Sequence, residues 1–128
     1  MVEKPAHSLS EATQLAAALE AQDSAAVAFA LRNDIVIVPL LPVDGPAQVR
    51  VFRAPGAETN TLLLFSSAGN YVRMVPKEDD HRILPYDRAQ LQEFLEKHLD
   101  AIDTVWFDVA GPHPMQADPR ELLSALAL

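Results

Sequence analysis

The chain has 128 residues, of which 49% are hydrophobic, and its formal net charge is −8 at pH 7. That length predicts a single domain over residues 1–128, because single domains usually hold roughly 50–200 residues. The acidic balance disfavours nucleic acid as a partner, since affinity for phosphate backbones depends on lysine and arginine, and it leaves another protein as the expected macromolecular partner.

Two helices are predicted near the start of the chain. Ser8 and Glu11 have the spacing of a capping box, in which each side chain satisfies a free backbone N–H of the other residue. The helix that follows them would place Leu15, Ala16 and Leu19 on one face. A second helix is expected over Ser24–Asn33. Its apolar face holds Val27, Ala30 and Leu31.

Three strands are predicted next. Residues 35–38 are β-branched and form the first strand, which should end at Pro39 because proline has no N–H for the ladder. Residues 47–54, AQVRVFRA, alternate between apolar and polar side chains, as a half-exposed strand does. Residues 62–65 are apolar without alternation, which indicates a strand buried on both faces in the middle of the sheet. The intervening APGAETN supplies the turn of a hairpin.

The second half of the chain begins with a short helix over Ala68–Met74, which we favour over a strand. An acidic loop and a brief strand at residues 82–84 should follow. Asp87 and Gln90 then form a second capping box, which opens a helix. The apolar stripe of this helix contains Leu91, Phe94, Leu95, His98 and Leu99.

The last two predicted elements complete the expected fold. Residues 104–109, TVWFDV, form a strand, and Asp118, Pro119 and Glu121 open a final helix. This order of elements predicts an α/β domain, with α+β as the alternative, in which helices flank a mixed β-sheet.

Composition excludes several classes of site and location. No apolar stretch approaches the roughly 20 residues that span a bilayer, so no membrane protein is expected. The chain has no cysteine, which rules out disulfides, thiol catalysis and cysteine-based metal sites. Its start, MVEKPAHSLSEATQ, lacks the basic and apolar regions of a secretion signal, and we expect a cytoplasmic protein.

The histidines and the acidic run KEDDH do not form a metal-binding pattern. The four histidines are His7, His81, His98 and His113. None has the paired spacing that directs two imidazoles at one ion, so we expect neither a metal nor a cofactor, and we interpret His98 as structural or partly exposed. KEDDH, residues 77–81, lacks the spaced oxygens and glycine of a calcium loop, which favours a solvated loop.

Polar residues that follow two of the predicted strands are the candidate binding groups. Ser66 and Ser67 follow the buried strand, but no glycine stands two residues before either, so capping of the next helix is favoured over a nucleophilic role. Asp108 and the AGPHP turn follow the last strand, at the position where α/β folds place ligands. A change of chain direction, fixed by one glycine and two prolines, explains every residue of this turn except His113. The candidate binding residues are Ser66, Ser67, Asp108, Gly111, Pro112 and His113, and none is assigned as catalytic.

Three segments carry a resemblance to a known family. IVIVPLLP, LLLFSS and VWFDVAGPHPMQADPRELLSAL are similar, over about residues 20–128, to the N-terminal domain of the SseB family, named from a protein linked to enhanced serine sensitivity. Ser66 stands where the family usually has threonine, and Asp108-Val109 where it often has Asn-Pro. The resemblance implies an α/β module without an established catalytic centre, and longer relatives continue into a second domain.

The sequence therefore predicts a non-catalytic protein-interaction or regulatory module, and it leaves self-association into homo-oligomers open. One alternative is a small-molecule binder or hydrolase-like enzyme that uses the region of Ser66, Ser67 and His113. A further alternative is an immunity-type partner, whose acidic surface covers a basic toxin.

Overall fold

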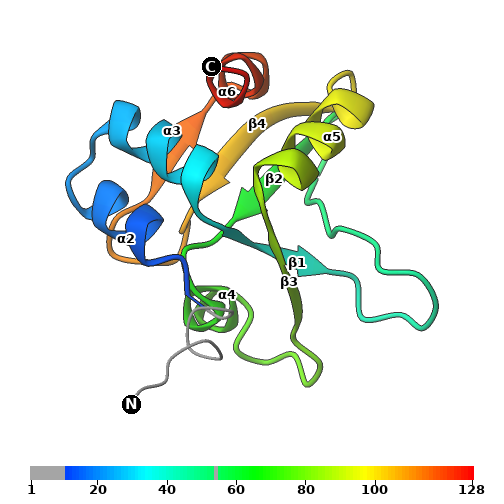
Figure 1. The fold of residues 1–128 in the computed structure, drawn as a ribbon. Coiled ribbons are helices and arrows are strands. Elements are labelled where there is room, and N and C mark those ends of the chain that lie inside the picture. Colours follow the sequence, from blue (N-terminus) through cyan, green and yellow to red (C-terminus); the bar gives the residue numbers. More distant parts are fainter. Residues whose placement is uncertain (1–10, 54) are drawn as a thin grey trace.

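The computed structural model describes residues 11–53 and 55–128, whose helices and strands are shown in Figure 1. The helices are α2 (Thr13–Glu20), α3 (Ser24–Asn33), α4 (Ala68–Met74), α5 (Arg88–His98) and α6 (Pro119–Leu126). The strands are β1 (Val36–Leu40), β2 (Asn60–Leu64), β3 (Arg82–Tyr86), β4 (Ile102–Phe107) and β5 (Met115–Ala117).

The strands form two small sheets, and among the described residues an isolated β-bridge joins them directly. β1 pairs with β3 in antiparallel orientation, while β4 pairs in parallel with β2 and in antiparallel orientation with β5. Ile37 and Phe65 link the two sheets, because the N–H of each donates to the carbonyl of the other at 2.9 and 3.0 Å. The predicted α/β class, a mixed sheet flanked by helices, is confirmed.

Successive residues of the strands point to opposite faces, and both faces are covered. One face packs on the main core, which α2, α3, α5 and α6 complete. The strand residues of this core are Val36, Val38, Leu62, Leu64, Ile102, Val105 and Phe107. The other face forms a smaller cluster with Tyr71 of α4, and Figure 1 shows α4 below the strands and α3, α5 and α6 above them. Its strand-side residues are Ile37, Leu63 and Phe65, with Trp106 packed against them. The predicted double burial of residues 62–65 is confirmed.

Side-chain caps fix the starts of four helices, of which α4 is capped by Ser67. Asp23 accepts hydrogen bonds from two backbone N–H groups at the start of α3. At α5, Asp87 and Gln90 form the reciprocal capping box, with both hydrogen bonds at 2.9 Å. Asp118 caps α6, which has Pro119 in its first turn. These caps are local interactions, and a proline in the first turn loses no helical hydrogen bond.

The first predicted helix differs from the observed α2. α2 begins at Thr13 and its N-cap, Ala12, supplies no side-chain hydrogen bond. The predicted cap Ser8 lies outside the described residues. Leu15 and Leu19 are buried as predicted, but Ala16 is exposed and Ala18 takes its place in the core. Alanines occupy three successive positions of α2, so composition alone could not select the buried one.

β1 continues through Pro39, contrary to the prediction that the strand stops before it. Ile37 directs its N–H and carbonyl to Phe65, so Pro39, two residues later, also points its nitrogen away from β3. Its missing N–H therefore breaks no hydrogen bond of the β1–β3 ladder. Its carbonyl accepts from the N–H of Arg50 at 2.8 Å.

Residues 49–52 are extended but form only isolated bridges, and the strand predicted there is wrong in that respect. The predicted alternation still holds, because Val49 and Val51 pack on the main core while Arg50 reaches the opposite face. The hairpin is also confirmed: Phe52 and Thr61 exchange backbone hydrogen bonds at 2.9 and 2.6 Å. The short strand β5 was not predicted.

The burial of α5 leads to a first prediction, and it corrects the expectation that Phe94 is a core residue. Leu95 is fully buried, whereas Phe94 is only partly buried. Leu95→Ala should lower the free energy of unfolding by about 2–5 kcal/mol, because it leaves a cavity in the core. Phe94→Ala should cost less than Leu95→Ala in the same urea titration. A larger loss for Phe94→Ala would mean that the face of α5 is misplaced.

Candidate functional site

The parallel pairing of β2 and β4 brings two polar residues together. Ser66 lies just past the end of β2, and Asp108 follows β4 directly. Parallel strands have their carboxyl ends at the same edge of a sheet, where open α/β folds bind ligands. Two residues that are 42 positions apart in the chain therefore meet at this edge.

Ser66 binds the carboxyl group of Asp108 through two hydrogen bonds. Its backbone N–H donates to Oδ1 at 2.7 Å, and its hydroxyl donates to Oδ2 at 2.5 Å. Both residues are buried, with exposed fractions of 3% and 4%. Asn70 of α4 adds a longer hydrogen bond, from its side-chain nitrogen to the Ser66 hydroxyl at 3.3 Å. We call the pair of Ser66 and Asp108 the Ser66–Asp108 clamp. Its two hydrogen bonds satisfy polar groups that would otherwise be costly to bury.

The turn after β4 is shaped by Asp108 and Gly111. Asp108 has φ of +48°, a left-handed conformation that aspartate tolerates better than most residues. Gly111 donates its N–H to the Asp108 carbonyl at 2.8 Å. A Cβ at Gly111 would lie 3.3 Å from Asp108 Cβ and 3.4 Å from two side-chain atoms of Asn70. Glycine is thus suited to this position because the turn packs closely on the clamp.

A surface cleft of about 450 Å³ lies over the clamp, between α2, α4 and the turn. It contains four of the predicted site residues: Ser66, Asp108, Pro112 and His113. The sequence reasoning missed its other lining residues, which are Thr13, Ala16, Ala17, Leu19, Glu20, Asn70 and Arg73. Asn70 and Arg73 lie three residues apart on one face of α4, and this helical spacing was the available signal for adding both to the site.

The other two predicted site residues do not line the cleft. Ser67 caps α4, accepting a hydrogen bond from the Asn70 N–H at 3.1 Å, as the capping interpretation predicted. Gly111 supports the turn from beneath. Within the described chain, no hydrogen bond joins His113 to Ser66, although both line the same cleft.

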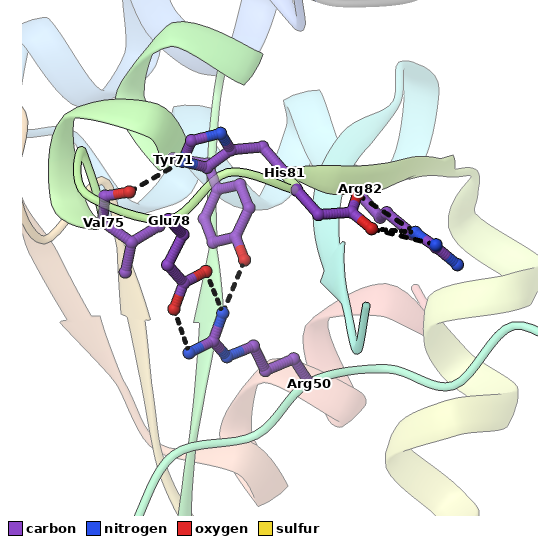
Figure 2. A network of polar contacts seen from close by, with 7 residues as sticks. Arg50, Tyr71, Val75, Glu78, His81 and Arg82 are labelled. Carbon is purple, nitrogen blue, oxygen red and sulfur yellow. Dashed lines mark hydrogen bonds and ion pairs between the residues drawn. The ribbon is translucent and has the colours of Figure 1, made fainter. Parts of the chain in front are cut away.

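A second polar network lies under α4 and includes the KEDDH loop (Figure 2). Arg50 donates two hydrogen bonds to the Glu78 carboxylate at 2.7 and 2.8 Å and one to the Tyr71 hydroxyl at 2.9 Å. The hydrogen bonds with Glu78 raise the pKa of Arg50, and those with Arg50 lower the pKa of Glu78. His81 Nε2 lies 2.7 Å from the Val75 carbonyl. The network fastens the loop to the smaller hydrophobic cluster.

Three of the loop's polar side chains, those of Glu78, Asp80 and His81, therefore bind protein atoms. Asp80 pairs with Arg82 at 2.9 Å, and Glu78 is engaged by Arg50. No group of three histidine or acidic residues suited to a metal ion occurs among residues 11–53 and 55–128. None of the helices described in those ranges is long and apolar enough to cross a membrane.

The lowered pKa of Glu78 predicts a pH-dependent contribution to stability. Because the folded pKa lies below the unfolded value of about 4.3, the stabilisation is complete above that value and is lost as pH falls through the folded pKa. Glu78→Gln should be less stable than the parent at neutral pH, and the difference should shrink below about pH 4. Urea titrations across this range measure it. Glu96→Gln, at an exposed position of α5, is the control, and a pH-independent difference for Glu78→Gln would contradict the assignment.

The clamp gives a second prediction for this region. Ser66→Ala removes the hydroxyl from Asp108 and leaves a buried carboxyl oxygen without that donor. The loss in free energy of unfolding should be about 1–3 kcal/mol. Ser124→Ala, at an exposed position of α6, should change stability by less than about 0.5 kcal/mol. Equal denaturation midpoints for the two variants would show that the clamp does not stabilise the fold.

Comparison with known proteins identifies the family. The family model that describes the SseB protein N-terminal domain matches residues 9–124 of this sequence, which is nearly the whole chain. The resemblance inferred from about residues 20–128 is thereby confirmed and extends towards the amino terminus. No curated protein and no solved structure gives a significant match. The fold, the clamp and the turn described above thus lie within a recognised domain, and the chain belongs to the SseB family through its N-terminal domain.

Proposed function

We propose that this domain is a non-catalytic binding module of the cytoplasm, and that the cleft over the Ser66–Asp108 clamp contacts a partner protein. The observation that carries the proposal is the clamp itself. Ser66 uses both its N–H and its hydroxyl on Asp108, so the buried polar pair stabilises the floor of the cleft.

The geometry of the cleft supports binding over catalysis. A catalytic base must come within hydrogen-bond reach of the nucleophile whose proton it removes. In the described chain, His113 forms no hydrogen bond with Ser66, and the Ser66 hydroxyl is already directed to Asp108. Serine and histidine line one cleft here without the mutual contact that a hydrolase requires.

The walls of the cleft support a protein as the partner. The α2 wall includes two small side chains, Ala16 and Ala17, which let a partner's surface approach closely at that point. Glu20 and Arg73 stand on opposite elements, and neither has a salt bridge within the described chain, so both are available to charges on a partner. Pairing charges across an interface contributes to specificity.

The proposal predicts that changes at the cleft weaken partner binding. The chain would be cross-linked in extract of its native cells, the bound protein identified by mass spectrometry, and its Kd measured by calorimetry. Arg73→Ala and His113→Ala should each weaken binding about tenfold or more, a loss of roughly 1.4 kcal/mol. The matched controls are Arg120→Ala on α6 and His98→Ala on α5, which lie outside the cleft and should bind as the parent does.

Two outcomes would count against the proposal. Equal affinity of the cleft variants and the parent would remove the cleft from the interface. If binding also collapsed at high salt, the net charge of −8 would favour the alternative of an acidic surface that covers a basic toxin. The hydrolase-like alternative would be favoured if the parent chain converted a substrate and the Ser66→Ala variant, although folded, did not.

A further inference from the structure

A second hollow lies on a different part of the molecule, between α5 and residues 47–51. It has a volume of about 350 Å³ and shares no residue with the cleft over the clamp. In Figure 1 the segment between β1 and β2 runs up beside α5 before β2 begins. Val49, Val51 and Ile102 supply aliphatic surface, and Tyr86 and Phe94 supply aromatic surface. We call this hollow the α5 groove.

The lining of the α5 groove contains no formally charged side chain. The other lining residues are Ala47, Gln48, Asn60, His98 and Ala101. This is notable in a chain with 18 acidic and 10 basic residues. The shallow depression beside it carries Glu93 and Lys97, but these two form an ion pair at 3.2 Å. A charged ligand would lose hydration in the groove without an opposite charge to replace it, so the lining favours a neutral one.

One polar group in the groove is free to meet a ligand. The Tyr86 hydroxyl has no hydrogen-bond partner among the described residues, although Tyr86 is half-buried. Burial, and then the nearby charge of Glu93, raise the pKa of Tyr86, so its hydroxyl stays protonated at neutral pH. Next to it, the rings of Phe94 and His98 pack with their centroids 4.5 Å apart. Half-buried polar groups of this kind orient ligands in otherwise apolar pockets.

We propose that the α5 groove binds a small neutral organic molecule, with an aromatic or other apolar ring against Phe94 and Val51 and one polar group hydrogen-bonded to Tyr86. The volume lies within the range of roughly 300–1,000 Å³ that is usual for small-molecule sites, towards its lower end. The apolar lining provides affinity through burial of the ring, while the hydroxyl fixes its orientation. This binding is separate from the partner contact proposed for the cleft.

The test uses indole as the neutral probe, with benzoate and benzylamine as its anionic and cationic counterparts. Each is titrated into the ¹⁵N-labelled chain and followed by NMR chemical shifts. Indole should cause saturable shifts at residues that line the α5 groove, with a Kd on the order of a millimolar for so small a ligand. The two charged probes should bind there at least about tenfold more weakly.

Two substitutions test whether indole binds in the α5 groove. Val51→Phe places a larger ring in the groove and should abolish the indole shifts, while Val72→Phe, at an exposed position of α4, should leave them unchanged. Tyr86→Phe keeps the shape but removes the hydroxyl, and should weaken indole about threefold to tenfold. If Val51→Phe fails to fold, Tyr86→Phe decides the question. The proposal is overturned if indole gives no saturable shifts, if they fall at the cleft, or if benzoate and benzylamine bind equally well.

Discussion

The parallel pairing of β2 with β4 is the constraint from which the rest of this structure follows. It brings Ser66 and Asp108 to one edge of the sheet, where two short hydrogen bonds join them. The left-handed backbone of Asp108 then directs the chain into the turn that closes the cleft. Because both residues are buried, the clamp combines a structural role with the positioning of the cleft above it.

Two surfaces of different chemistry result from this plan. The cleft over the clamp is bordered by Glu20 and Arg73, which have no salt bridge among residues 11–53 and 55–128, and by the small residues of α2. The α5 groove is lined by neutral and mainly apolar side chains. Charged borders suit a hydrated macromolecular partner, because charges on that partner can pair with them. An uncharged hollow suits a small neutral ligand, because a charged ligand would lose hydration there without gaining an opposite charge.

The Arg50 network shows how a long loop is held without regular structure. Residues 49–52 form isolated bridges only, yet Arg50 contacts Glu78 and Tyr71 across the smaller cluster. Its guanidinium also lies 4.9 Å from the centre of the Phe52 ring. Bidentate pairing and ring stacking restrict the arginine more than a single exposed ion pair would. The acidic loop, which the sequence predicts as a solvated loop, is thereby fixed at Glu78 and His81 (Figure 2).

The sequence by itself determined the features that depend on near neighbours. Caps such as Asp87 with Gln90, the helical period of α5 and the doubly apolar run of β2 are all set within a few residues, and they were predicted correctly. Only the tertiary structure decided that Pro39 could remain in β1, since this depends on which strand its nitrogen faces. It also decided that α4 carries Asn70 and Arg73 to the cleft and that Phe94 lines a groove, because both depend on contacts between segments that are distant in the sequence.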